Sequence, residues 1–167
     1  YSPVAVKWIR TTGSSFDVAT LNTDASGDAS TQIRVPATPG GTNFIWFVSG
    51  STSMTVNFDV VPRIKVTPAV TERGATVDIS LRGFARMEAI QIRWRLTGSS
   101  AWIVLATGTT SNTGSANIRI PVPNSAVDGT YQLRAETASF NQQTNTVVIR
   151  GGGQVIPAAE VVVTPEP

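Results

Sequence analysis

The stretch Ile90-Gln91-Ile92-Arg93-Trp94-Arg95-Leu96 decides the fold class of this chain. Its apolar residues occupy every second position, so an extended chain would be apolar on one face and polar on the other. Gln91, Arg93 and Arg95 would then point into water. This pattern predicts a half-buried β-strand that packs its apolar face on a core.

The same alternation recurs along the chain, each time bounded by Gly, Pro, Ser or Asn. It is found in the segments 54–60, 77–81, 116–120 and 131–135. No segment has the 3.6-residue period of an amphipathic helix. Short strands separated by turn residues predict an all-β fold of immunoglobulin-like sandwiches with Greek-key connections.

The chain also repeats itself. Three segments of its first half have counterparts about 86 to 88 residues further on: VAVKWI (4–9) with IQIRWR (90–95), GDASTQIRVP (27–36) with GSANIRIP (114–121), and GGTNFIWFVSG (40–50) with DGTYQLRAETA (128–138). The second pair differs by two extra residues in the first copy. A fourth pair, RIKVTPAV (63–70) and EVVVTPEP (160–167), shares Val-Thr-Pro after an apolar, alternating start. Repeats of this length predict tandem domains.

The register of the repeat predicts how the chain is divided. Residues 63–150 form a complete sandwich, whereas residues 1–62 are the C-terminal part of one and lack the counterpart of residues 63–89. Residues 151–167 combine a Gly-rich linker with a strand that either begins the next repeat or is donated to another molecule. The tandem fold is therefore expected to have an incomplete first sandwich.

The composition excludes several function classes. The chain has no histidine and no cysteine, which rules out Ser-His-Asp and Cys-His catalysis, a disulfide and a thiolate or imidazole metal site. The formal charge is only +2 and the arginines are spread over many segments, so nucleic acid is not a predicted partner. No apolar run approaches the roughly 20 residues of a membrane-spanning helix. We therefore predict no enzyme activity, no catalytic residue, no cofactor and no membrane insertion in this segment.

The two runs VTPAVTERGATVDISLRGFARMEAIQIRW (66–94) and SNTGSANIRIPVPNSAVDGTYQLRAE (111–136) resemble bacterial surface immunoglobulin-like repeats of the IPT/TIG and related types. The likeness is carried by Gly83-Phe84, Trp94, Gly114, Pro121 and Gly129-Thr130-Tyr131. It departs from that pattern at Leu81, where such repeats often have a second glycine. The resemblance extends over nearly the whole chain and implies a secreted or cell-surface stalk, hence an extracellular location, without catalytic activity.

An incomplete sandwich would leave unpaired backbone and an open apolar slot, which proteins normally cover. Two alternatives stay open: upstream residues of a longer array fill the slot, or the segment 154–164 of a neighbouring copy inserts as a donor strand. The second alternative predicts a head-to-tail polymer. Its predicted donor residues are Val155, Ile156, Val161, Val162 and Val163, and its predicted acceptor residues are Phe44, Trp46, Val56 and Phe58.

Other candidate sites are weaker. Asp24, Ser26 and Asp28 imitate the first positions of a calcium loop, but Val35 occupies the twelfth position, so we interpret the segment as a turn and predict no metal site. The carboxylates Glu72, Asp78, Glu88, Asp128 and Glu136 are not paired by spacing as a glycosidase would require.

Binding of a glycan is the alternative function. Trp8 and Trp94 occupy equivalent inward positions and are predicted core residues, whereas Trp46 and Trp102 are candidates for an exposed sugar platform. The arginines 82, 93, 95, 119 and 134 are interpreted as a solvated sheet face, with an anionic glycan as the alternative.

Overall fold

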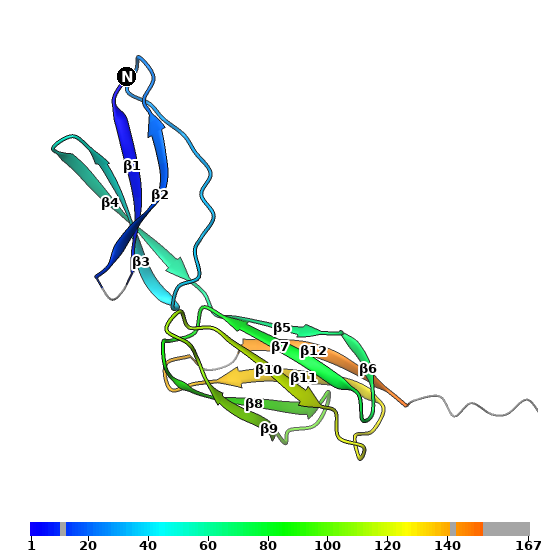
Figure 1. The fold of residues 1–167 in the computed structure, drawn as a ribbon. Coiled ribbons are helices and arrows are strands. Elements are labelled where there is room, and N and C mark those ends of the chain that lie inside the picture. The colour runs from blue at the N-terminus through cyan, green and yellow to red at the C-terminus, as the bar shows by residue number, and fades with distance from the viewer. Residues whose placement is uncertain (11–12, 141–142, 152–167) are drawn as a thin grey trace, which may run out of the picture.

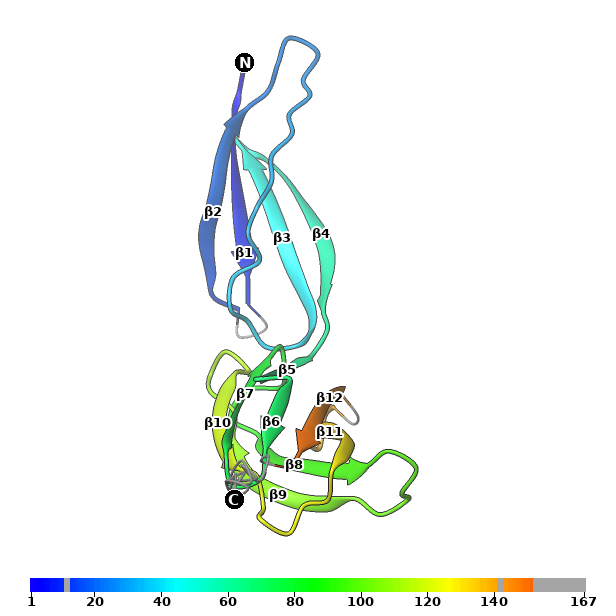
Figure 2. The ribbon, with the colours of Figure 1, turned by 90° about the vertical axis from the view of Figure 1, so that its right-hand side faces the viewer.

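The computed structural model describes residues 1–10, 13–140 and 143–151, and these residues form β-strands and loops without a helix. The fold is all-β, as the alternating sequence predicts (Figure 1). The described strands fall into two units that lie end to end, residues 1–62 and residues 63–151 (Figures 1 and 2).

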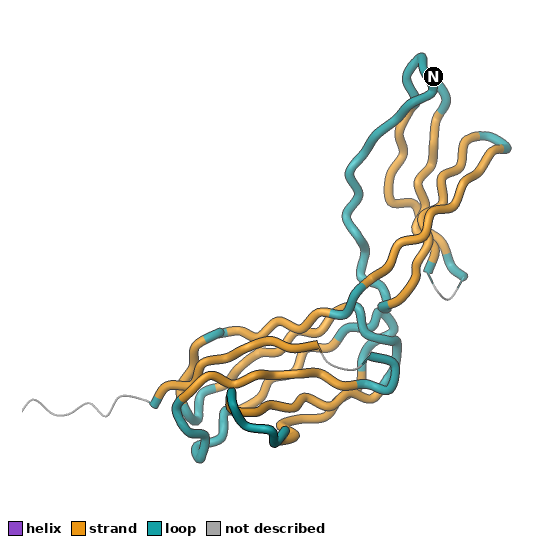
Figure 3. Tube along the Cα trace, turned by 180° about the vertical axis from the view of Figure 1, so that it is seen from behind, coloured by secondary structure: helices purple, strands orange, loops and turns teal. Residues whose placement is uncertain are grey.

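The first unit is a single antiparallel sheet of four strands in the order β2-β1-β3-β4. The strands are β1 (Pro3–Ile9), β2 (Ser15–Asn22), β3 (Gly41–Ser49) and β4 (Thr52–Val60). Between β2 and β3 the chain runs as a long extended loop along one face of this sheet (Figures 2 and 3). The described residues of this unit therefore form one sheet, where a sandwich has two.

The second unit is a sandwich of two sheets, one with the order β10-β7-β5 and one with the order β6-β12-β11-β8-β9. Its strands are β5 (Arg63–Thr67), β6 (Val70–Glu72), β7 (Thr76–Arg82), β8 (Ala89–Leu96), β9 (Ile103–Thr109), β10 (Ala116–Pro121), β11 (Gly129–Glu136) and β12 (Gln143–Arg150). All pairings are antiparallel except β6 with β12. Strands that are adjacent in sequence change sheets repeatedly, which is the Greek-key arrangement of immunoglobulin-like domains.

Alternation places the core of the second unit between its two sheets. Ile90, Ile92 and Trp94 of β8 are buried together with Val77, Ile79 and Leu81 of β7, Ile120 of β10, Leu133 and Ala135 of β11, and Val147 and Ile149 of β12. The ring of Trp94 stacks on the ring of Tyr131, with 4.3 Å between centroids. The Tyr131 hydroxyl donates to the Val127 carbonyl (3.1 Å) and accepts from the Val127 N–H (3.2 Å), the tyrosine corner of Greek-key sandwiches.

Backbone contacts at close range join the two units. The Gly40 N–H donates to the Phe84 carbonyl at 3.0 Å, and Pro62 in the short link between β4 and β5 is buried. Gly114 has φ +64°, and a Cβ placed on it would lie 1.9 Å from the Phe84 oxygen and 3.0 Å from the Cα of Pro39. Since only glycine lacks a Cβ, the sequence at Gly114 permits a contact that other residues would block.

Candidate functional site

The repeat matches the first unit to one sheet of the second unit, strand by strand. The order β2-β1-β3-β4 corresponds to β9-β8-β11-β12. Trp8 in β1 and Trp94 in β8 take matching places and are 0% and 5% exposed, so the prediction that both are core residues is confirmed. Strands β5, β6 and β7 have no counterpart among the described residues of the first unit, which is why the first sandwich is incomplete.

The missing strands leave the face of β4 uncovered. Phe58 of β4 pairs with Asn43, and Val147 of β12 pairs with Tyr131, so Phe58 and Val147 occupy matching positions. Phe58 is 38% exposed, whereas Val147 is 2% exposed. In the second unit this position is covered by other strands. In the first unit the described residues leave it open.

The extended loop covers the other half of the same face. Trp8 is fully buried and Val6 is 1% exposed, although both lie on a single sheet. The Trp8 ring also makes an edge contact with Phe58, at 5.7 Å between centroids. The Trp8 indole N–H has no hydrogen-bond partner among the described residues. The first unit thus has a formed half core beside an open half.

Part of the loop matches a strand of the second unit but has no strand beside it. Aligned on Pro36 and Pro121, the segment 31–36 corresponds to β10, which pairs with β7. Within the described part of the chain, no hydrogen bond is formed by the backbone of residues 29–37. Val35 is 43% exposed, and Ile120 at the matching position is 3% exposed. The segment is extended and alternating, but it lacks the neighbour that would make it a strand.

Arg34 lacks the acidic partner that its counterpart in the second unit has on β7. Its counterpart Arg119 donates from Nε to the Asp78 carboxylate of β7 at 2.8 Å, and this hydrogen bond holds the pKa of Asp78 below its ordinary value and raises the pKa of Arg119. Arg34 has no ion-pair partner among the residues that the structure describes. A groove beside it at the junction of the units carries two further arginines, Arg63 and Arg82, and no acidic side chain among the described residues.

Two turns that the repeat aligns have the same pattern of side-chain hydrogen bonds. The Asp24 Oδ1 accepts from the N–H groups of Ser26 (2.8 Å) and Asp28 (3.0 Å), which makes the predicted calcium-like segment a hydrogen-bonded turn. In the matching turn the Ser111 Oγ accepts from the Thr113 N–H at 3.3 Å and from the Ser115 N–H at 3.2 Å.

Asn43 takes the place of Tyr131. It is fully buried, its Nδ2 donates to the carbonyl of Pro39, four residues upstream, at 3.2 Å, and its Oδ1 accepts from the Thr38 hydroxyl at 3.0 Å. The Asn43 amide thus donates to the carbonyl four residues upstream, as the Tyr131 hydroxyl does in the second unit.

The four predicted acceptor residues divide between the two faces of the first sheet. Val56 pairs with Ile45 and Phe58 pairs with Asn43, which places both on the face of Trp8. Phe44 pairs with Ile9, and Trp46 pairs with Lys7, so these two lie on the opposite face and are half-buried there. Lys7 on that face is bound to Asp17 at 3.0 Å. The predicted donor residues Val155, Ile156, Val161, Val162 and Val163 lie outside the described residues.

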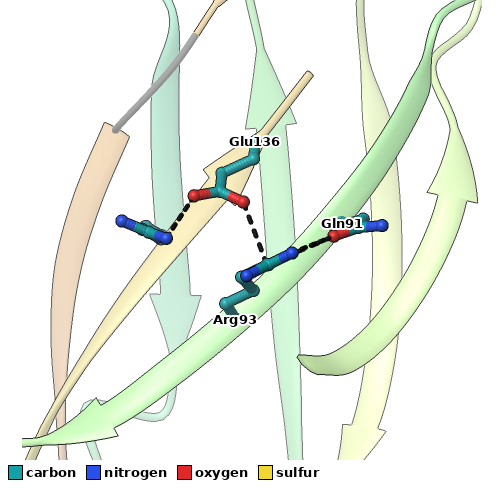
Figure 4. A network of polar contacts seen from close by, with 4 residues as sticks. Gln91, Arg93 and Glu136 are labelled. Carbon is teal, nitrogen blue, oxygen red and sulfur yellow. Dashed lines mark hydrogen bonds and ion pairs between the residues drawn. The ribbon is translucent and has the colours of Figure 1, made fainter. Parts of the chain in front are cut away.

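The candidate glycan residues are not gathered at one site. Trp46 lies in β3 of the first unit, and Arg82 and Arg119 lie in β7 and β10. Trp102 comes directly before β9 and contacts arginines of β8 and β11. Trp102 is half-buried, and the guanidinium carbons of Arg95 and Arg134 stack on its ring at 4.6 and 4.1 Å from the centroid. These cation–π contacts occupy ring surface that a sugar would need. Figure 4 shows the neighbouring network, in which Arg93 binds Glu136 at 2.9 Å and donates to Gln91 at 2.7 Å.

The other predicted carboxylates are also tied to structural partners. Asp128 pairs with Arg73 at 3.2 Å, and the Glu88 Oε1 accepts from the N–H and hydroxyl of Ser139. Asp78 and Glu136 are bound to arginines as described, and Glu72 lies exposed at the end of β6. Asp78, Glu88, Asp128 and Glu136 therefore each have a hydrogen-bond or ion-pair partner within the second unit.

The comparisons with known proteins give fold-level similarity alone. No protein-family model and no curated protein matches the sequence. Among solved structures, the chain is similar to macromomycin (15% identity, TM-score 0.45, 54% of this chain and 100% of that one). It is also similar to the sensor domain of the anti-sigma factor RsgI4 of Pseudobacteroides cellulosolvens (13% identity, TM-score 0.42, 55% of this chain and 95% of that one). A third is a tetra-tandem repeat in the extending region of a large adhesion protein (15% identity, TM-score 0.40, 89% of this chain and 40% of that one). Scores this low assign no function to the chain.

None of the residues that the structure describes belongs to a helix that could cross a membrane.

Proposed function

We propose that this chain is a non-catalytic structural repeat of an extracellular fibre or cell-surface stalk, of the IPT/TIG-like type, that associates with copies of itself. The incomplete first unit is then completed by β-structure delivered from outside residues 1–62. The matched pair Phe58 and Val147 carries this proposal, because the same position is 38% exposed in one unit and 2% exposed in the other.

The first unit is expected to take up another strand because the apolar face of β4 is exposed to water. Met54 and Val56 lie beside Phe58 on β4 and are 60% and 43% exposed. An apolar strand face next to unpaired edge groups is a template for another strand, and proteins usually cover it. Addition of a strand satisfies both needs, since its backbone forms hydrogen bonds with an unpaired segment while its side chains fill the slot.

The segment 154–164 of a neighbouring copy is the proposed source, and a head-to-tail polymer is the resulting assembly. A carbohydrate-binding adhesion module is the weaker candidate, because arginines cover the Trp102 ring on which a sugar would stack.

Three forms of the chain test the proposal by sedimentation velocity and electron microscopy. The full chain should assemble, and a chain without residues 152–167 should not. A third form carries a second copy of residues 63–86 in front of Tyr1, which the repeat aligns with Met87. It should also fail to assemble through the first unit, because it brings its own strands. Assembly of all three forms to the same extent would reject the proposal.

A further inference from the structure

Strand β7 makes three kinds of interaction in the second unit: strand pairing, core packing and an ion pair. It pairs with β10 on one side and β5 on the other, and its inward residues Val77, Ile79 and Leu81 are 3%, 1% and 0% exposed. Its outward Asp78 binds Arg119. A strand that replaced β7 in the first unit would therefore need three alternate apolar residues and an acid between the first two.

The register of β10 with β7 specifies where each of these residues would lie. Ile120 pairs with Val77, Arg119 with Asp78 and Ile118 with Ile79. Transferred to the first unit, the incoming strand would place an apolar residue opposite Val35, an acid opposite Arg34 and an apolar residue opposite Ile33. Val35 is exposed and Arg34 is unpaired among the described residues, so both are consistent with a missing partner of this kind.

The sequence of residues 158–164 satisfies this pattern. It is Ala-Ala-Glu-Val-Val-Val-Thr, against Thr-Val-Asp-Ile-Ser-Leu-Arg in β7. Glu160 then corresponds to Asp78, Val161 to Ile79 and Val163 to Leu81. Pro157 and Pro165 bound the segment, which makes the proline-free run seven residues long, the length of β7. Proline cannot donate to a ladder, so these two residues also limit where the strand can pair.

We infer that residues 158–164 of a second copy of this chain occupy the place of β7 in the first unit, with Glu160 bound to Arg34. This inference rests on the proposed function, for which it names the inserted strand and its register.

A second copy is required by the length of the tail. Strand β12 runs away from the first unit (Figure 1), and seven Cα–Cα steps lead from Gly151 to Ala158. Fully extended they span about 25 Å. The eight residues of β12 have to be retraced first, and they span about 27 Å. The tail is therefore too short to run back along β12 and then enter the first unit of its own chain.

Disulfide trapping between two full-length chains tests the register, because the sequence has no cysteine of its own. Asn117 pairs with Ser80, so Gln32 should lie opposite Val162 on the outward side. We expect a Gln32→Cys chain to cross-link to a size-tagged Val162→Cys chain at least about tenfold more than to a Val161→Cys chain, whose cysteine points to the other face. A strand in the place of β5 would not reach Gln32, since β5 pairs with β7 alone.

Charge reversal tests the ion pair independently. In the acceptor, Arg34→Glu should lower the cross-linking rate by about threefold or more, and Glu160→Arg in the donor should restore it. Arg34 is exposed, so loss of folding does not explain such a pattern. Absence of the Gln32 to Val162 cross-link, equal cross-linking to Val161→Cys, or no rescue by the reversed pair would overturn the inference. The three-form experiment described above separates the two proposals. If the cross-link fails but assembly still depends on the open first unit, the proposed function stands and only the assignment of residues 158–164 to the place of β7 is wrong.

Discussion

Phe58→Ala should cost more stability in a completed first unit than in an open one. The comparison uses the chain with residues 63–86 added in front of Tyr1 and the unmodified chain, each with and without Phe58→Ala. In the open unit Phe58 already contacts Trp8 but remains 38% exposed, whereas completion should bring it to the 2% of Val147. The additional loss in the completed unit is the coupling between Phe58 and the added strands.

The magnitude follows from the area. The further burial is 36% of the residue (38% less 2%). For a phenylalanine of about 200 Å² this is about 70 Å². At about 25 cal/mol per Å² the coupling is about 1.8 kcal/mol, or about 20-fold in the unfolding equilibrium. A difference between variants is used because it is less sensitive to the unfolded-state reference than an absolute burial energy.

Hydrogen exchange of β1 and β3 amides, followed against urea, gives the unfolding free energy of the first unit separately from the second. Thr55→Ala is the control, since Thr55 is an exposed β4 residue that pairs with Trp46 on the opposite face. It should show no coupling to the added strands. Equal losses from Phe58→Ala in both chains, or equal coupling for Thr55→Ala, would refute the reasoning.

Three further outcomes are expected. Tyr131→Phe removes both hydrogen bonds to Val127 and should lower the unfolding free energy of the second unit by about 1 to 2 kcal/mol in urea titrations; a change below about 0.3 kcal/mol would contradict the role of the corner. Gly114→Ala should cost at least about 2 kcal/mol, because φ is +64° and the new Cβ meets the Phe84 oxygen; Gly98→Ala, at φ +93° with no atom within 4 Å of its Cβ, should cost less, and equal losses would count against the close contact. The pKa of Asp78 is lowered by its hydrogen bond with Arg119, so its stabilising contribution is present above the unfolded pKa of about 4 and is lost as the pH falls through the folded pKa. Melting temperatures of Asp78→Asn should therefore fall less than those of the original chain between about pH 5 and pH 2.5, and parallel curves would contradict this.

The strands and the main core residues could be predicted because alternation alone determines which face of a strand is apolar. Trp8 and Trp94 are examples, since each lies in an unambiguous alternating run and each is buried. Strand β12 carries Thr and Asn beside Val147, and its polar start gave no such pattern. Sequence similarity alone does not predict a strand in the segment 27–36. The segment matches β10 in sequence but has no strand to pair with.

The faces of Phe44 and Trp46 could not be predicted, because the run from Phe44 to Val48 is apolar on both faces. Only the register with β1 places Ile45 with Trp8 and Trp46 with Lys7. Arg34 and Val35 were not among the predicted interface residues. Their alignment with Arg119 and Ile120 was visible in the sequence, but the partners of those two residues on β7 became known only from the strand pairing.

Hydrogen exchange of the amides of residues 31–35 tests most directly whether the first unit lacks a strand of its own. In the dilute, unassembled chain these amides should exchange about as fast as in an unstructured peptide. In the assembled chain, and in the chain with residues 63–86 in front of Tyr1, every second one of them, the N–H groups that point toward the added strand, should exchange at least about a hundredfold more slowly, equivalent to about 2.7 kcal/mol. Strong protection in the unassembled chain, or fast exchange in all three samples, would contradict the account.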